Sequence, residues 1–172
     1  MTHVNIASPA APQLVYPPAR LRGYNLAQLL EWFETNLCII EHLDPRGHQV
    51  AFDLSRFAYM IKLVNKQGQK VVKPLRAAER IKAAQLTEQD FGPFNSDRSE
   101  TLSWLPCVVN TPLNIRQNVC VNIPGDEVYV RQVQKQGAKF KLLFCERMGG
   151  GLLVPVTSFR QEKEPKGQII WP

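Results

Sequence analysis

Cationic and aromatic side chains alternate along the last third of the chain in a pattern that suits binding of a phosphate backbone. In an extended strand every second side chain points to the same face. Alternation over residues 127–160 therefore predicts one face that carries Tyr129, Arg131, Lys139, Lys141 and Thr157. Lysine and arginine can grip phosphate and a tyrosine ring can stack on a base, so this face suits RNA. The alternative is the ordinary solvent-facing side of a two-layer domain.

Cleavage of RNA without a metal needs a base for the 2′-hydroxyl, an acid for the leaving oxygen, and cations for the charge on the phosphorus centre. His48 is the candidate acid or base. It follows a turn and begins a predicted strand, where its side chain would face the open side of the sheet. Arg131 is the predicted phosphate clamp, and Thr157 would hydrogen-bond a non-bridging oxygen. The alternative for His48 is an ordinary exposed histidine in a turn. The alternative for Thr157 is that a threonine simply favours a strand.

Four further residues are predicted to bind the substrate: Arg98, Tyr129, Lys139 and Lys141. Arg98 lies in a long polar connection, and an ordinary salt bridge in that loop is an equally good interpretation. Lys141 would be a second phosphate clamp, whereas packing at the sheet margin is the alternative for Tyr129. The chain contains no GxGxxG, GxxxxGK[ST], HExxH or GxSxG motif, so we expect no metal and no cofactor.

The first half of the chain is predicted to be mainly helical. Asn25 can cap a helix with Gln28 three places on, and apolar residues then recur at helical spacing to about residue 40. The further predicted elements are a strand over 48–54, helices over 56–65 and 74–85, and an irregular connection over 86–103. A short apolar turn or helix follows Trp104-Leu105-Pro106, and another is expected over 111–118.

The C-terminal part is predicted to form an antiparallel sheet. Strands are expected over 127–133, 139–147 and 152–160, and residues 169–171 add a last short one. Pro155 cannot donate a hydrogen bond to a neighbouring strand, so we expect a sheet edge or a bulge there. The face expected to pack on the helices is Val128, Val130, Phe140, Leu142, Phe144, Leu152, Val154 and Val156.

These elements predict an α+β fold in which N-terminal helices pack on a small C-terminal antiparallel sheet. A length of 172 residues suits one domain. Residues 1–22 are predicted to be a flexible tail, and residues 23–172 a single domain. Its expected parts are 23–85, mainly helical, 86–126, loop and short helices, and 127–172, antiparallel sheet.

The net charge of +6 is concentrated in residues 56–82 and 127–172. This favours a polyanionic partner, and nucleic acid before membrane, because no amphipathic anchor accompanies the cations. A solvated basic surface without a partner is the open alternative. No apolar run approaches the ~20 residues that span a bilayer, and no export signal is visible, so the expected location is the cytoplasm.

From Arg98 onward the chain contains four segments of a known pattern: RSETLSWLPCVVNTPLNIRQN, EVYVRQV, KFKLLFCE and GGLLVPVTSF. They resemble the phage-associated nucleases of the barnase–EndoU–colicin–RelE class. The resemblance covers the C-terminal part of the chain, while the N-terminal helices fit that class only in outline. The matching positions are Arg98, Trp104-Leu105-Pro106, Pro112-Leu113-Asn114-Ile115, Tyr129, Arg131 and Thr157-Ser158-Phe159.

The resemblance implies a helical layer followed by a four-stranded antiparallel sheet, metal-independent RNA cleavage through 2′-hydroxyl attack, and an acidic immunity or antitoxin protein as partner. Such sites use a histidine together with arginine, lysine, serine or threonine. This chain departs from that pattern, because none of its histidines, His3, His42 and His48, lies in the strand block. Three hypotheses stay open: a ribonuclease of phage or toxin type, an inactive RNA-binding domain on the same scaffold, and a protein-interaction module with an incidental basic surface.

Overall fold

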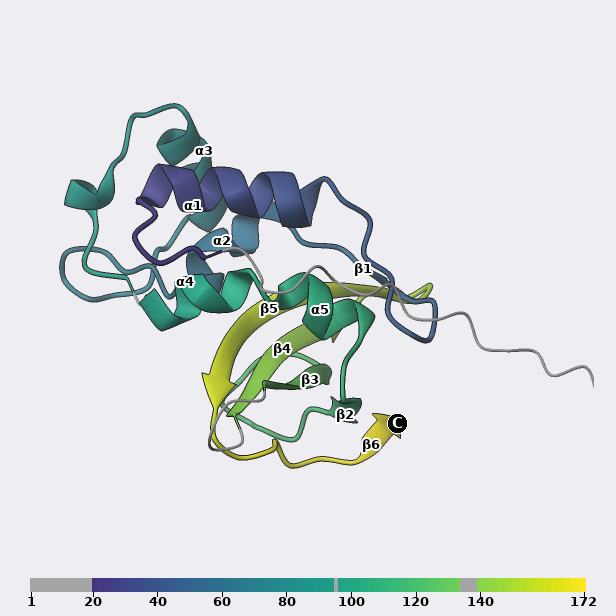
Figure 1. Cartoon of the computed structure of the whole chain (residues 1–172). Coiled ribbons are helices and arrows are strands. Elements are labelled where there is room, and N and C mark those ends of the chain that lie inside the picture. The colour runs from purple at the N-terminus through teal and green to yellow at the C-terminus, as the bar shows by residue number, and fades with distance from the viewer. Residues whose placement is uncertain (1–19, 95, 134–138) are drawn as a thin grey trace, which may run out of the picture.

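A six-stranded mixed sheet organises the described part of the chain (Figure 1). The computed structural model describes residues 20–94, 96–133 and 139–172; most of the predicted tail, with His3, lies outside the described residues. The strand order is β1-β5-β4-β3-β2-β6. The strands are β1 Gln49–Val50, β2 Asn114–Gln117, β3 Glu127–Val133, β4 Lys139–Arg147, β5 Leu152–Gln161 and β6 Ile169–Trp171.

This sheet corrects the predicted one in extent and direction. β1 runs parallel to β5, with Gln49 beside Leu152, while the other neighbouring pairs are antiparallel. A small antiparallel sheet confined to residues 127–172 is therefore wrong, because β1 and β2 also belong to it. Residues 114–117, which we predict as part of a short turn or helix, instead form β2 and pair with β3 and β6. Such short strands are stabilised by distant partners, so local periodicity does not reveal them.

The helices are short. α1 begins with the predicted capping box of Asn25 and Gln28, and the π-helix η1 continues its apolar stripe. The helix predicted over 56–65 ends early as α2, because Lys62 takes a left-handed conformation with φ 55°. The stretch 86–103, predicted to be irregular, contains η3 and the whole of α4. The helices are α1 Leu26–Phe33, η1 Glu34–Cys38, η2 Leu54–Arg56, α2 Phe57–Met60, α3 Pro74–Lys82, η3 Glu88–Asp90, α4 Ser96–Leu102 and α5 Leu105–Asn110.

Within the described residues, no helix combines the length and the apolar character that crossing a membrane requires.

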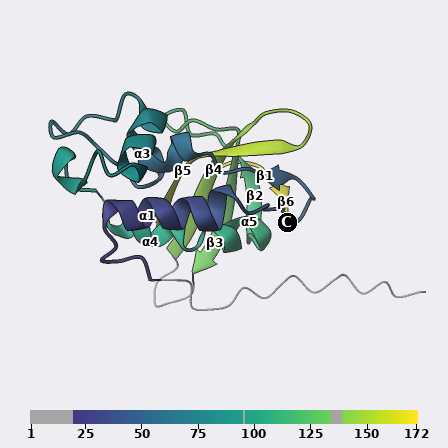
Figure 2. The same ribbon diagram turned by 90° about the horizontal axis from the view of Figure 1, so that it is seen from above.

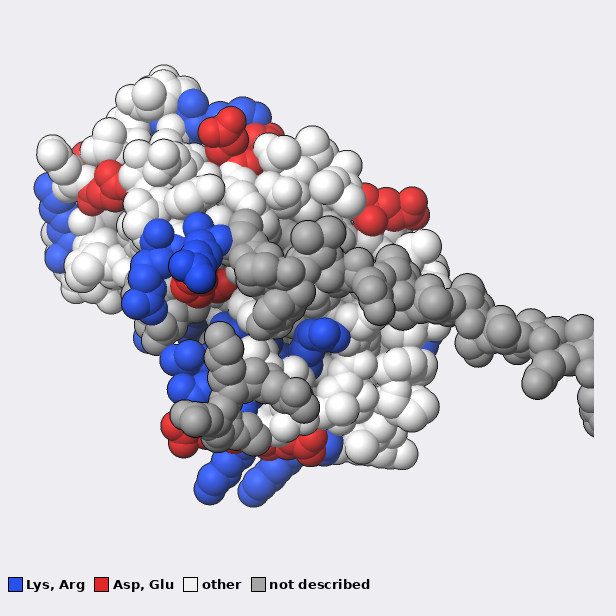
Figure 3. All heavy atoms as spheres, viewed as in Figure 1, with Lys and Arg blue, Asp and Glu red and all other residues white. Residues whose placement is uncertain are grey.

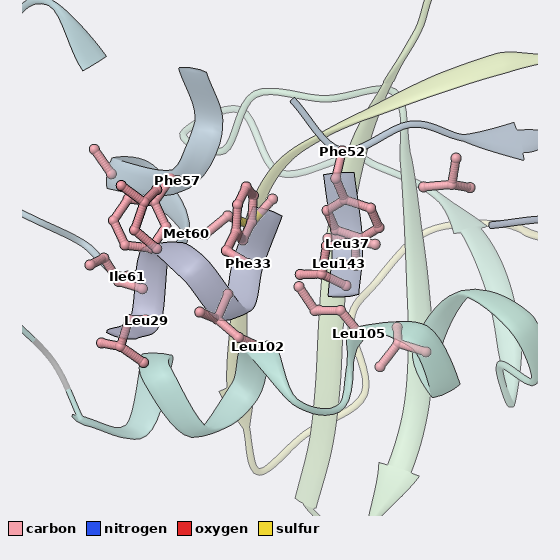
Figure 4. Packing of buried hydrophobic residues seen from close by; sticks show 14 of the residues in the cluster. Leu29, Phe33, Leu37, Phe52, Phe57, Met60, Ile61, Leu102, Leu105 and Leu143 are labelled. Carbon is pink, nitrogen blue, oxygen red and sulfur yellow. The ribbon is translucent and has the colours of Figure 1, made fainter. Parts of the chain in front are cut away.

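The helices cover one face of the sheet, and the main hydrophobic core lies between them (Figures 1 and 2). Figure 4 shows Phe33 and Leu37 of the first helical segment gathered with Leu105 and Leu143 from the other side of this core. The sheet side of the core is Val50, Ile115, Tyr129, Leu143, Cys145 and Leu153. The opposite face carries a second, smaller cluster of Val128, Val130, Phe140, Leu142 and Phe144.

The helices thus pack on the face opposite to the one that we predict. Both faces of β4 are apolar, because residues 140–145 are hydrophobic except for Lys141, and Leu143 and Cys145 are fully buried. Alternation tells which residues share a face. It does not tell which face meets the helices when both faces are apolar.

A β-bulge in β5 shifts the alignment of its second half. Phe144 lies opposite Thr157, whereas Cys145 lies opposite Pro155, so Val156 is the extra residue. Of the two alternatives predicted at Pro155, an edge or a bulge, the structure has a bulge directly beside the proline. Beyond the bulge Thr157 shares a face with Phe144, while Tyr129 is on the other face, opposite Leu143. The predicted cationic face is therefore divided between the two sides of the sheet.

Candidate functional site

Tyr129 is a buried structural residue, which corrects its predicted role in stacking on a base. The side chain is fully buried among the core residues beneath the helices. Its hydroxyl donates a hydrogen bond to Oδ2 of Asp44 at 2.8 Å and accepts one from Arg46 at 3.2 Å. The pKa of Tyr129 lies above its ordinary value, mainly because the hydroxyl is buried. The hydrogen bond to Asp44 raises this pKa further. The ring is inaccessible to a ligand in this arrangement.

Arg131, Lys139 and Lys141 lie on the helix-covered side of the sheet, so the predicted open cationic face is wrong. Lys141 is only 6% exposed, and its Nζ donates to Oγ1 of Thr101 in α4 at 3.2 Å. Arg131 donates to the hydroxyl of Thr111 at 2.7 Å and to the carbonyl of the same residue. Polar groups at the C-terminal ends of α4 and α5 therefore bind two of the predicted phosphate clamps.

His48 lies far from the other predicted catalytic residues. It directly precedes β1, beside the start of β5, whereas Lys141 pairs with Arg131 and with a residue near the end of β5. The first residue of β5 and Thr157 are separated by about 16 Å at 3.3 Å per residue. The Nδ1 atom of His48 lies 4.0 Å from Oδ2 of Asp44, and the ring borders a hollow of about 170 Å³ beside the triple-glycine turn. The predicted constellation does not converge.

Two predicted residues, Arg98 and Thr157, do meet, at the edge of a larger open pocket of about 580 Å³. Four segments build this pocket: the end of η2 with α2 and the loop after it, α4, residues 122–124, and the second half of β5. The charged and aromatic residues that line it are Arg56, Tyr59, Lys62, Lys70, Arg98 and Phe159. We call it the basic pocket.

Arg98 is held against β5 by several contacts. Its Nη1 donates to Oγ1 of Thr157 and to the carbonyl of Ser158, each at 3.1 Å. The guanidinium carbon lies 5.2 Å from the ring centre of Phe159, and that ring in turn stacks on Phe144 at 5.4 Å. Burial lowers the pKa of Arg98, yet a guanidinium remains charged at neutral pH. The edge of β5 therefore carries a fixed positive charge inside the basic pocket.

The mouth of the basic pocket is also cationic. Lys62 and Lys70 are exposed, and neither has an ion-pair partner among the described residues. The bridge between Val64 and Lys70 closes the loop and returns the second lysine toward the first. Arg56 pairs with Glu146 at 3.2 Å in a half-exposed contact, which adds little to stability.

The described lining of the basic pocket carries only positive charge. The described lining residues include no aspartate, glutamate or histidine. Figure 3 shows Lys and Arg side chains gathered at the left edge of the molecule, over the loop that follows α2. A lining of this kind attracts anions and offers hydrogen-bond donors, but it has no group that exchanges a proton readily at neutral pH.

Sequence reasoning misses Arg56, Tyr59, Lys62 and Lys70 as site residues. The one signal for them is the concentration of positive charge in residues 56–82. That signal marks a region and not a site, because the pocket exists only where this region meets β5.

Within the described part of the chain, no three His, Cys, Asp or Glu side chains are grouped as metal ligands. No family model matches the chain, and no curated protein or solved structure matches it either. The nuclease resemblance therefore rests on the four sequence segments alone.

Proposed function

We propose that the protein binds single-stranded RNA through its phosphates in the basic pocket, without cleaving it. One observation carries this proposal: Lys62, Lys70 and Arg98 come together around one opening whose described walls hold no acidic side chain. Three like charges repel one another, so their convergence is favourable when an anion lies between them. RNA supplies such anions in series along its backbone.

The size of the basic pocket favours a single strand over a duplex. At about 580 Å³ it lies within the range of roughly 300–1,000 Å³ that small-molecule sites occupy. One nucleotide that is splayed out of a flexible strand suits a concavity of that size. A double helix presents its phosphates on a broad surface and would meet only the rim.

Binding is better supported than cleavage. Attack by a 2′-hydroxyl needs a proton acceptor within hydrogen-bond reach, and the described lining of the basic pocket offers none. His48 belongs to a separate hollow at the start of β5. The ribonuclease hypothesis, with an acidic immunity or antitoxin partner, is therefore our second choice.

Fluorescence anisotropy with a labelled oligouridine tests the proposal. We expect Lys62→Ala/Lys70→Ala to weaken binding by about tenfold or more at low salt. The slope of log affinity against log salt should become shallower by about 1.4, at 0.7 per lost contact with a single strand.

The matched control is Lys163→Ala/Lys166→Ala, which removes the same charge from exposed positions after β5 that do not line the pocket. If both double variants lose the same affinity, net charge alone explains the loss of RNA binding, and the proposal is overturned. A stable complex with an acidic protein, without measurable RNA affinity, would instead select the protein-interaction hypothesis.

A further inference from the structure

We infer that Tyr59 stacks on a base of the bound strand, so that the ligand must carry a nucleobase beside its phosphate. This inference rests on the proposed function and adds what the pocket recognises besides charge. Two aromatic rings line the basic pocket, those of Tyr59 and Phe159.

Phe159 is already engaged on its ring faces. It stacks on Phe144 with ring centres 5.4 Å apart and planes inclined by 19°, and the guanidinium of Arg98 lies over it at 5.2 Å. These contacts leave little of the ring for a ligand. The role of Phe159 is to hold Arg98 at the edge of β5.

Tyr59 is placed differently. It is half-buried on α2, and its side chain makes no hydrogen bond or ring contact with any residue that the structure describes. A tyrosine whose ring borders a cationic pocket and has no partner of its own offers a surface for a flat ligand. Stacking of bases on such rings is a general mode of single-strand binding.

The backbone ties Tyr59 to a phosphate-binding group. The amide of Lys62 donates to the carbonyl of Tyr59 at 3.2 Å, in the turn that ends α2. Lys62 has a φ of 55°, a conformation that glycine or asparagine adopts more readily than lysine. The lysine stands at this strained position three residues after the tyrosine, and both residues line the pocket. A base on Tyr59 would bring its own phosphate to Lys62.

The decisive comparison uses two labelled probes on the wild-type protein, an oligouridine and an abasic ribose–phosphate oligomer of equal length and charge. We expect the abasic oligomer to bind about tenfold more weakly, the size of one stacking contact. Tyr59→Leu should weaken the oligouridine by a similar factor and leave the abasic oligomer unchanged. Tyr59→Phe should retain affinity, because stacking needs the ring and not the hydroxyl.

Tyr24→Leu is the matched control, since Tyr24 is exposed and does not line the pocket. Equal affinity of the two probes for the wild type would overturn the inference while the proposed function stands. If neither the oligouridine nor the abasic oligomer binds, the proposed function itself is overturned. The wild-type comparison needs no variant, so it decides whether the ligand must carry a nucleobase even when Tyr59→Leu fails to fold.

Discussion

The hydroxyl of Tyr129 donates a 2.8 Å hydrogen bond to the carboxylate of Asp44, which lies 85 residues earlier in the chain. Arg46 extends this contact, because its Nη2 lies 2.7 Å from Oδ2 of Asp44 and 2.7 Å from Oε2 of Glu127. The two carboxylates are almost completely buried. This network joins the turn before β1 to β3, and it replaces the ligand-facing role predicted for Tyr129.

We expect Tyr129→Phe to lower the free energy of unfolding by about 1–2 kcal/mol, because one buried carboxylate oxygen loses a donor while Arg46 still binds it. Urea denaturation measures this change. RNA affinity should stay the same. Weaker RNA binding at unchanged stability would contradict the structural role and restore base stacking by Tyr129.

Acid should destabilise the protein through Asp44. Burial alone would raise the pKa of this carboxyl, but hydrogen bonds from Arg46, Tyr129 and the His48 amide outweigh it, so the pKa lies below its ordinary value. The resulting stabilisation is complete above the unfolded-state pKa of about 3.9 and is lost as the pH falls through the lower folded-state pKa.

Denaturation curves between pH 2 and pH 6 check this expectation. Asp44→Asn should be less stable at neutral pH, by roughly 3–5 kcal/mol for a broken buried ion pair. Below pH 4 the stability of this variant should also fall less steeply than that of the wild type. A variant with the full wild-type decline would show that other carboxylates cause it.

Thr157 should affect RNA binding through Arg98. Thr157→Val removes one of the two acceptors that hold Nη1 of Arg98, while the carbonyl of Ser158 remains. We expect the RNA affinity to fall about threefold, because the guanidinium is less well fixed. Thr111→Val removes a similar acceptor from Arg131, outside the pocket, and should leave RNA affinity unchanged. The opposite ranking of these variants would point to the helix-covered face as the binding site.

Lys141→Met tests the predicted phosphate clamp directly. The lysine is buried beneath α4, where its Nζ lies 5.9 Å from the ring centre of Trp104. Because a bound strand cannot reach it there, we expect RNA affinity to change by less than about twofold. A tenfold loss, measured by the same anisotropy titration and with unchanged thermal stability, would return Lys141 to the site.

Incubation with labelled tRNA in EDTA tests cleavage. We expect the RNA to stay intact, because His48 is separated along β5 from the basic pocket. Binding of the oligouridine by His48→Ala should match that of the wild type. Cleavage that disappears in both His48→Ala and Arg131→Ala would reject binding without cleavage and support the ribonuclease hypothesis.

Local chemistry alone predicts several elements of this protein. The capping box at Asn25, the strands over 127–133 and 139–147, and the bulge at Pro155 depend on residues that are near one another in the chain. Hydrogen-bond donors, side-chain periodicity and the missing proline amide act over a few residues, so their outcome is visible in the sequence. The concentration of charge in residues 56–82 likewise points to the region that lines the basic pocket.

Tertiary structure decided the rest. Both faces of the sheet are apolar, and the alternation of side chains along the strands does not distinguish them. Which face meets the helices depends on which one packs better against them. The parallel pairing of β1 with β5 and the pairing of Tyr129 with Asp44 join distant residues. The basic pocket exists because four separate segments meet, so its shape and its charge are properties of the packed chain.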